Sequence, residues 1–436
     1  MTNSAQHQNR NLTLIFRPAT AAIAIAIALA LAVVLTQPAR AQTFTVIHSF
    51  TGGGDGSNPG IGLTLDKAGN LYGGTLLGGN KSEYCAPTCG MVFKMIRSKS
   101  SWVYYPLHLF TGQDGAAGGH LIFAPDGSLY GIGGTYVYHL KPPAAACKSF
   151  LCEWTDTVIW TFCCGTESPG GLTFDSAGNL YGAQESGSVA NHCSGGLGCG
   201  YIFQLVPLGG DNWTYNEIYQ FHGGDGAHPE STLIFDQAGN LYGTTGGLYG
   251  GDGNGNVFEL TPSNAGYWNE TILYTFQDGS DGRFPVAGVI FDAAGNLYGA
   301  SSSEGLNEGG AIFELMPSNG NWNFNLLYSP SGSSPYPEGV NSSLLMDAAG
   351  NLYGTNYING AYNLGSVFKL THSNGGWTYT SLHDFTGGSD GAYPEGSLAM
   401  DSNGNLYGAT FAGGNTGANC SPNDSYQCGV VFEITP

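Results

Sequence analysis

The chain has 436 residues, of which 71 are glycine, 42% are hydrophobic and only 10% are charged. Glycine at about twice its usual frequency, without a collagen period and beside this apolar content, excludes a collagen-like or disordered chain. The 32 acidic residues outnumber the 12 basic ones, and such a surface repels nucleic acid and anionic membranes.

Residues 1–41 have the features of a secretory signal peptide. Arg10 and Arg17 precede an apolar run from Ala21 to Leu35, which is short for a membrane span. Ala39-Arg40-Ala41 then fits a cleavage site before Gln42. The segment holds three of the 12 basic residues and no acidic one, which leaves a formal charge of −23 on the mature chain. An uncleaved anchor is the alternative interpretation.

One octapeptide recurs along the remaining chain, and Asp292-Ala293-Ala294-Gly295-Asn296-Leu297-Tyr298-Gly299 represents it. Seven tyrosines mark its copies: Tyr72, Tyr130, Tyr181, Tyr242, Tyr298, Tyr353 and Tyr407. They are separated by 58, 51, 61, 56, 55 and 54 residues, and a period of this size predicts a repeat architecture.

The octapeptide predicts a turn between two β-strands. Gly-Asn tolerates positive φ, and the leading Asp can accept hydrogen bonds from backbone N–H groups two residues on. Apolar residues precede the turn and Leu-Tyr follows it, which is the pattern of a β-hairpin. The Asp and Asn could also suggest a metal site, but turn formation is sufficient to explain the pair.

Each repeat shows four strand patterns, which in the sixth repeat cover Ser342–Met346, Asn351–Thr355, Ser366–Leu370 and Trp377–Phe385. The fourth strand usually opens with Trp and closes with Phe, and Trp322–Pro330 is a variant. We expect these aromatic residues to pack between repeats. His48, His108 and His383 share one fourth-strand position that holds Tyr or Trp elsewhere, which favours packing over catalysis.

The chain contains six fourth strands but seven copies of the other three. The missing one stands at the opposite end, because Phe44–Phe50 matches the end of Trp377–Phe385. Such a permutation removes a free sheet edge when a ring closes. We therefore predict an all-β fold, a seven-bladed β-propeller of four-stranded blades that forms a single domain over residues 42–436. Phe44–Phe50 should close the last blade by pairing with Val430–Ile434.

The ten cysteines fit export to an oxidising compartment. Local pairs in equivalent loops predict the disulfides Cys85–Cys89, Cys193–Cys199 and Cys420–Cys428, with Cys147–Cys152 as a further bridge. Cys163 and Cys164 form either a vicinal bridge or a free pair. A zinc site is not expected because the CxxC spacing is absent.

The recurring Asp-x-Ala-Gly-Asn-Leu-Tyr-Gly, followed by Gly-x-Val-Phe-Glu-Leu-Thr-Pro, resembles the exported bacterial "choice-of-anchor" tandem-repeat family called GloVer. The resemblance covers residues 43–436. It implies an exported protein but no established activity. Many members of the family end in a C-terminal sorting anchor. The segment Phe432–Pro436 does not resemble such an anchor, so we do not infer anchoring from the resemblance. The turn motif is also similar to that of NHL-type propellers, which include binding modules and enzymes.

Candidate ligand-binding residues lie in the loops that join the blades. Five of these loops carry an Asp-Gly motif, at Asp55, Asp114, Asp225, Asp281 and Asp390. Three loops place a Pro-Glu pair at the start of the innermost strand, with Glu230, Glu338 and Glu395. Turn chemistry explains the aspartates and a solvated rim explains the glutamates. The sharper hypothesis is an acidic funnel near the propeller axis, on the face that carries the bridged loops, for a cation or sugar hydroxyls.

No catalytic fingerprint is present, and the calcium-loop pattern that begins at Asp252 fails at Val257 and Ser263. We therefore expect no cofactor, no bound metal and no catalytic residue. The expected function is that of a secreted or cell-surface scaffold, an exported bacterial protein that binds a glycan, a cation or an extracellular protein. It should be a monomer without nucleic-acid partners or membrane insertion after signal removal. The alternative is a carbohydrate-active enzyme, a polysaccharide lyase or glycoside hydrolase, with Glu338 and Glu395 as acid and base.

Overall fold

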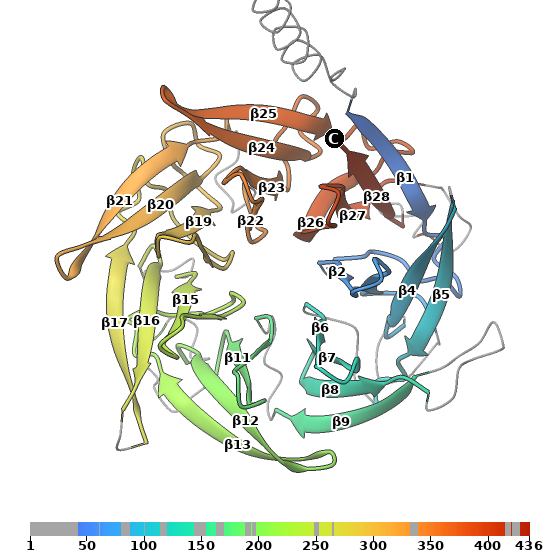
Figure 1. Ribbon diagram of the computed structural model, residues 1–436, viewed down its shortest axis with the longest axis horizontal. Helices are drawn as coiled ribbons and strands as arrows, with labels where there is room; N and C mark the ends of the chain where they lie inside the picture. Colours follow the sequence, from blue (N-terminus) through green and yellow to red (C-terminus); the bar gives the residue numbers. More distant parts are fainter. Residues whose placement is uncertain are drawn as a thin grey trace, which may run out of the picture. The chain divides into compact units, whose positions relative to one another are not determined.

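The computed structural model describes residues 42–60, 62–79, 88–99, 101–113, 120–143, 154–162, 170–187, 193, 198–247, 253–263, 266–331, 339–414, 420 and 428–436. It contains seven four-stranded antiparallel sheets arranged in a ring, which confirms the predicted seven-bladed β-propeller (Figure 1). Residues Thr43–Thr435 form one compact unit. Within the described ranges no helix is both long and apolar enough to cross a bilayer. The predicted signal peptide, residues 1–41, lies outside those ranges and stays a prediction.

We number the blades by the chain order of their octapeptide. The first strands, nearest the centre of the ring in Figure 1, are β2 (Thr64–Leu65), β6 (Ile122–Phe123), β10 (Thr173–Phe174), β14 (Ile234–Phe235), β18 (Ile290–Phe291), β22 (Leu345–Met346) and β26 (Ala392–Met400). The second strands are β3 (Leu71–Thr75), β7 (Leu129–Gly133), β11 (Leu180–Gln184), β15 (Leu241–Thr245), β19 (Leu297–Ser301), β23 (Leu352–Asn356) and β27 (Leu406–Ala412).

In blades one to six the two outer strands are longer than the two inner ones. The third strands are β4 (Met91–Ser98), β8 (Tyr136–Lys141), β12 (Tyr201–Gly209), β16 (Asn256–Pro262), β20 (Ala311–Ser318), β24 (Ser366–Ser373) and β28 (Val430–Thr435). The fourth strands are β5 (Ser101–Leu109), β9 (Thr155–Thr161), β13 (Asn212–Gln220), β17 (Trp268–Thr275), β21 (Asn321–Tyr328), β25 (Gly376–Asp384) and, from the other end of the chain, β1 (Thr43–Ser49).

Six of the seven innermost strands are shorter than the sequence predicts, and only β26 is long. In blade six the expected strand Ser342–Met346 is reduced to the two residues of β22. The residues before these strands also approach the neighbouring blade closely. A Cβ added at Gly170 would lie 2.6 Å from the carbonyl oxygen of Ser231 in the next blade. Small residues in this stretch therefore bring the seven blades together around the axis.

The octapeptide forms the predicted turn. In blade six the Asp347 carboxylate accepts hydrogen bonds from the backbone N–H groups of Ala349 and Asn351, both at 2.9 Å. Its second oxygen accepts from the Asn351 amide at 2.7 Å and from the Tyr353 hydroxyl at 2.9 Å. The same set of bonds recurs around Asp66, Asp175, Asp236, Asp292 and Asp401. The marker tyrosine thus stabilises the turn as well as the strand.

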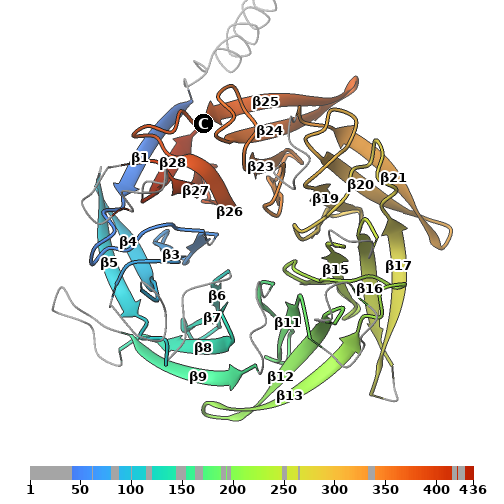
Figure 2. The same cartoon turned by 180° about the vertical axis from the view of Figure 1, so that it is seen from behind.

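The N-terminal strand closes the ring. β1 pairs with β28, with Phe44 opposite Ile434 and Ser49 opposite Val430, so the last sheet has the order β1-β28-β27-β26. The blue strand β1 lies beside the red strand β28 in both views (Figures 1 and 2). An ion pair of 3.0 Å between Arg97 and Glu433 joins blade one to blade seven. The predicted closure is confirmed.

The hydrophobic core lies between neighbouring blades. Each of the seven core clusters combines residues from two adjacent sheets. Fourth-strand tryptophans pack edge-on against the octapeptide tyrosine of the preceding blade, as Trp102 does on Tyr407 with ring centroids 5.6 Å apart. The expected packing role of these aromatic residues is confirmed.

Two predicted disulfides are present, Cys193–Cys199 and Cys420–Cys428, with Cα atoms 5.2 and 5.3 Å apart. Cys89 is also disulfide-bonded, and its expected partner Cys85 lies outside the described residues. Cys147, Cys152, Cys163 and Cys164 lie outside them as well. The disulfides fit a protein that matures in an oxidising environment.

Candidate functional site at the propeller axis

Two sets of loops meet on one face of the propeller, which we call the loop face. In blades one, four, five and six the residues that enter the blade are hydrogen-bonded to residues directly after its second strand. In blade four the N–H of Gly246 donates to the carbonyl of His228 at 2.8 Å, and in blade six Tyr357 donates to Gly339 at 2.9 Å. The Cys193–Cys199 and Cys420–Cys428 bridges belong to second-to-third strand loops, so they lie on this face too.

The Asp-Gly motifs bind the loop face to the fourth strands. Asp225 accepts hydrogen bonds from the Tyr219 hydroxyl and the His222 N–H, both at 2.7 Å. Asp281 accepts from the Tyr274 hydroxyl and the Gln277 N–H, both at 2.8 Å. His48 and His383 take the place of these tyrosines and pair with Asp55 at 3.3 Å and Asp390 at 3.1 Å.

The partner of each Asp is thus the variable His or Tyr near the end of the preceding fourth strand. His48 and His383 also stack on Tyr104 and Phe44, as expected from packing. Asp114 lies outside the described residues. Ligand binding by the five aspartates stays a prediction, since the four that are described already serve as acceptors within their loops.

All seven blades contribute to one pocket. Seven equivalent positions line it, each three residues before the last residue of its first strand: Gly62, His120, Gly171, Thr232, Gly288, Ser343 and Ser397. Further lining residues are Gly60, Glu230, Ser231, Val286, Ala287, Asn341, Ser342 and Gly396. A pocket lined from every blade must lie on the axis, and we call it the axial pocket. Its volume is about 140 Å³.

Glu230 is the only carboxyl group among the described residues that line the axial pocket. The side chain is partly buried. Burial, and then the nearby charge of Glu185, raise the pKa of the Glu230 carboxyl to about 8. At neutral pH this carboxyl is therefore mostly protonated, so it can both donate and accept a hydrogen bond.

Glu395 holds the same position in blade seven, five residues before the end of its first strand. It is not among the residues that line the pocket. Its carboxyl lies beside blade one, since a Cβ added at Gly60 would be 2.6 Å from Glu395 Oε2. Burial raises the pKa of Glu395 to about 7. Glu395 is therefore a rim residue next to the pocket.

Glu338 lies outside the described residues. In blade six the position that corresponds to Glu230 belongs to Asn341, five residues before the end of β22. The hydrogen bond from Tyr357 to Gly339 gives the same alignment, because it matches the bond from Gly246 to His228. The Pro-Glu pair of blade six therefore precedes the Pro-Glu pairs of the other blades by three residues.

His120 is a pocket residue that the sequence did not single out. It replaces the small residue of the axial ring in blade two, and burial lowers the pKa of its imidazole. A Cβ added at Gly62 would lie 2.6 Å from His120 Nδ1, so the ring rests against blade one. Alignment of the blades on their hairpins, instead of a search for histidine clusters, would have revealed it.

The lining is suited to hydrogen bonding with neutral groups. Hydroxyl and amide side chains surround one protonated carboxyl, together with a histidine whose lowered pKa favours the neutral ring. Ca²⁺ takes six or more oxygen ligands and usually several carboxylates. Among the described residues no group of three or more His, Cys, Asp or Glu side chains could hold a metal ion.

The profile of the Gloeobacter/Verrucomicrobia repeat matches residues 151–338 and again residues 249–436, which together span more than half of the chain. The protein belongs to this repeat family. The match confirms the resemblance to GloVer repeats that the octapeptide indicates. No curated protein matches the sequence.

Several solved structures are similar in fold to this member of the repeat family. A protein of unknown function from Dyadobacter fermentans has a TM-score of 0.48 at 11% identity, covering 91% of this chain and 99% of its own. A luciferin-regenerating enzyme has a TM-score of 0.42 at 10% identity, with coverages of 91% and 95%. A gluconolactonase from Xanthomonas campestris has a TM-score of 0.39 at 13% identity, with coverages of 71% and 82%. What those proteins do is not transferred to this chain.

Proposed function

We propose that this protein is an exported, non-catalytic binding protein that holds a neutral, hydroxyl-rich ligand, such as the end of a glycan chain, in the axial pocket. The observation that carries the proposal is Glu230, a carboxyl whose pKa is raised to about 8 in a pocket of hydroxyl and amide groups. A neutral carboxyl matches a sugar hydroxyl, since both donate and accept. The volume of about 140 Å³ suits one sugar unit.

Export places such a pocket where glycans are available. The predicted signal peptide, the disulfides and membership of the repeat family all support a location outside the cytoplasm. The strongly acidic composition disfavours anionic polymers as ligands because of charge repulsion. A cell-surface adhesion or capture role is the natural use of this propeller.

A glycan array followed by calorimetry with the best-binding glycan tests the proposal. Glu230→Ala should weaken binding about 10-fold, since a lost hydrogen bond with a desolvated partner costs roughly 1–3 kcal/mol. Glu230→Gln should stay within a few-fold of wild type at neutral pH, because the amide keeps one donor and one acceptor. Wild-type affinity should fall as the pH rises through about 8, whereas the Glu230→Gln protein should show no such fall.

Glu217→Gln, an exposed glutamate on β13, is the matched control and should bind as wild type does. Equal loss of binding in Glu230→Gln and Glu230→Ala at neutral pH would mean that the ionised carboxylate is needed. Such a result would favour a cation-dependent or catalytic site and contradict the proposal.

The carbohydrate-active enzyme is the second candidate. The observation that favours it is the raised pKa of Glu230 and Glu395, to about 8 and about 7, because a general acid needs a pKa near the working pH. Incubation with a panel of polysaccharides, followed by assays for new reducing ends and for unsaturated sugars, distinguishes the two candidates. Cleavage that disappears in Glu230→Gln would replace the binding proposal with this one.

A further inference from the structure

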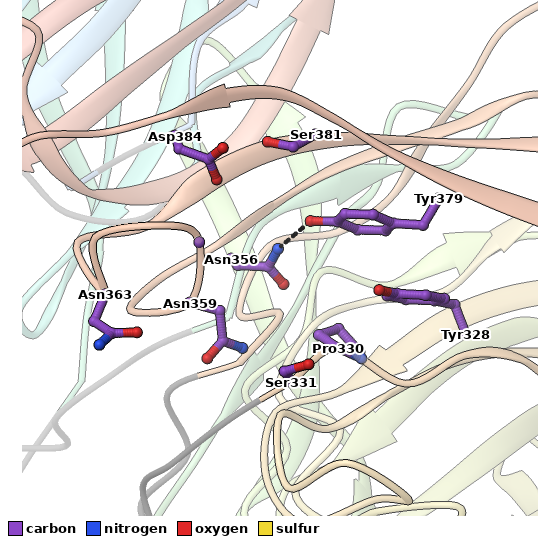
Figure 3. Close-up of a pocket in the computed structure, with 10 residues that line it drawn as sticks. Tyr328, Pro330, Ser331, Asn356, Asn359, Asn363, Tyr379, Ser381 and Asp384 are labelled. Atoms are coloured by element: carbon purple, nitrogen blue, oxygen red, sulfur yellow. Dashed lines mark hydrogen bonds between the residues drawn. The ribbon is translucent and has the colours of Figure 1, made fainter.

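A second pocket lies away from the axis, between blades five and six. Figure 3 shows the side chains of both blades that surround it. It is lined by Tyr328, Pro330, Ser331, Asn356, Asn359, Gly360, Asn363, Tyr379, Ser381 and Asp384, and its volume is about 380 Å³. We call it the lateral pocket. Its size is typical of a small-molecule site.

One departure from the repeat accounts for the pocket. In the six other blades a buried phenylalanine stands directly after the fourth strand: Phe50, Phe110, Phe162, Phe221, Phe276 and Phe385. These rings fill the space between blades, as Phe276 does against Phe313 with centroids 5.4 Å apart. In blade five the residue is Pro330. The corresponding space beside Phe368 and Tyr379 therefore lacks an aromatic ring.

The backbone has adapted to this proline. In blade four the N–H of Phe276 donates to the carbonyl of Gly255 at 3.1 Å. Pro330 has no N–H, and the Ser329 hydroxyl donates to the carbonyl of Gly310 at 2.9 Å instead. The substitution is thus accommodated without loss of the inter-strand bond. The backbone beside Pro330 keeps its link to the neighbouring strand, so the lateral pocket is not a local defect of the fold.

Two buried amides leave an atom without a partner in this pocket. Asn356 is 1% exposed, and its Nδ2 lies 3.0 Å from Ser366 Oγ and 3.2 Å from the Tyr379 hydroxyl. Among the described residues, neither its Oδ1 nor Nδ2 of Asn359, which is 9% exposed, has a hydrogen-bond partner. Both neighbours of Asn356 are hydroxyls that can donate or accept, so a rotated amide would still leave one atom unpaired. A buried unpaired polar atom costs free energy unless a ligand or water satisfies it.

The rest of the lining defines the class of ligand. Tyr328 stacks on Tyr379 with centroids 4.4 Å apart, and Figure 3 shows both hydroxyls directed toward the asparagines. The loop after Tyr328 has no Asp-Gly motif to engage its hydroxyl. No lysine or arginine lines the pocket and Asp384 contributes a carboxyl group, which excludes phosphate and other anions on charge.

We propose that the lateral pocket is a second binding site, for a neutral saccharide of one or two units. Amide, hydroxyl and carboxylate groups provide the mixed donors and acceptors that vicinal sugar hydroxyls need. The unpaired atoms of Asn356 and Asn359 are the positions that a bound sugar satisfies. This site is independent of the axial pocket, since the two share no lining residue.

Pro330→Phe restores the residue of the other six blades and should fill the pocket. Asn356→Thr is the second variant, because threonine holds this position in blades one, four and seven as Thr75, Thr245 and Thr410. Both variants should keep the wild-type melting temperature or raise it. Saturation-transfer NMR with a panel of neutral mono- and disaccharides at millimolar concentration gives the readout. Each variant is made in the Glu230→Ala protein, in which binding at the axial pocket is weakened.

At least one sugar should bind the Glu230→Ala protein, and its affinity should fall at least 10-fold in both double variants. Glucose 6-phosphate should not bind. The proposal is overturned if no sugar of the panel binds the Glu230→Ala protein, or if binding persists in folded Pro330→Phe and Asn356→Thr. Loss of all sugar binding in Glu230→Ala alone would assign every site to the axial pocket and would also contradict the lateral site.

Discussion

Asp347 and Glu230 carry the same chemical group in opposite surroundings. Burial raises the pKa of Asp347, but hydrogen bonds from Asn351, Tyr353 and Ala349 outweigh it and hold that pKa below its ordinary value. Burial without comparable donors raises the pKa of Glu230 to about 8. The repeated turn therefore stabilises an ionised carboxylate, and the axis holds a neutral carboxyl. The number of donors within reach separates the structural acids from the proposed functional one.

These two classes give opposite pH limits to stability. The turn aspartates Asp66, Asp292, Asp347 and Asp401 have lowered pKa values, so the stability they contribute is present above about pH 4 and is lost as the pH falls. Glu230 and Glu395 have raised values, so the folded state holds more protons than the unfolded chain above about pH 4.5. Their contribution therefore declines as the pH rises toward about 8.

We predict that the melting temperature is highest near pH 5 and falls on both sides. The double variant Glu230→Gln with Glu395→Gln should weaken the alkaline decline and keep the acid one, because it removes two glutamates with raised pKa values. Glu270, whose pKa burial raises to about 7, remains and accounts for the rest of the decline. Calorimetric scans between pH 3 and pH 9 measure both limbs. An alkaline decline of unchanged size in the double variant would show that other groups cause it.

At the scale of elements, a proline in four of the loops that join the blades packs against a glycine of the preceding blade, and we call this contact the proline latch. Four loops place a residue with φ between +55° and +59° before proline: Asn58, His228, Phe284 and Tyr393. The N–H of Tyr393 donates to the Leu364 carbonyl of blade six at 2.8 Å. The following Pro394 covers Gly365, where an added Cβ would lie 2.2 Å from Pro394 Cδ. The strained residue is held by contacts with the preceding blade.

Gly365 and Gly320 form a matched pair for testing the latch. Both have positive φ, +95° and +83°, but a Cβ at Gly320 would have no atom within 4 Å. Gly320→Ala should destabilise by about 1–2 kcal/mol from the left-handed conformation alone. Gly365→Ala should cost about 1–3 kcal/mol more, because the methyl group overlaps Pro394 and also the carbonyl oxygens of Tyr357 and Asn356. Urea unfolding of the two variants compares them, and equal losses would show that the latch does not couple the blades.

For the molecule as a whole, repetition made the fold predictable. The octapeptide predicted the hairpin, and the fourth strand displaced to Phe44–Phe50 predicted the ring that β1 closes. The close approach of neighbouring blades near the axis was harder to predict from the sequence. It shortens the innermost strands, and it brings His120 and Glu230 from separate blades into one pocket. In blade six the position of Glu230 belongs to Asn341, three residues after Glu338, which the Pro-Glu pattern alone did not indicate.

The two proposed sites differ in how visible they are in the sequence. Pro330 stands out as the one fourth-strand terminus without phenylalanine, so the lateral pocket is marked by a break in a pattern. The axial pocket has no such mark, because its ring consists mostly of small residues from every blade. Its chemistry depends on the protonation of Glu230, which burial determines and a linear sequence does not encode.

The pKa of Glu230, measured by carbon NMR of carboxyl-labelled glutamate, tests the central claim most directly. The account predicts a resonance that titrates near pH 8 in the free protein and at higher pH once the best-binding neutral glycan is added, because the ligand binds the protonated form. The Glu230→Gln protein, which lacks this resonance, assigns it. Titration near the ordinary value of about 4.3, or a fall in pKa on addition of the glycan, would contradict the proposed axial site.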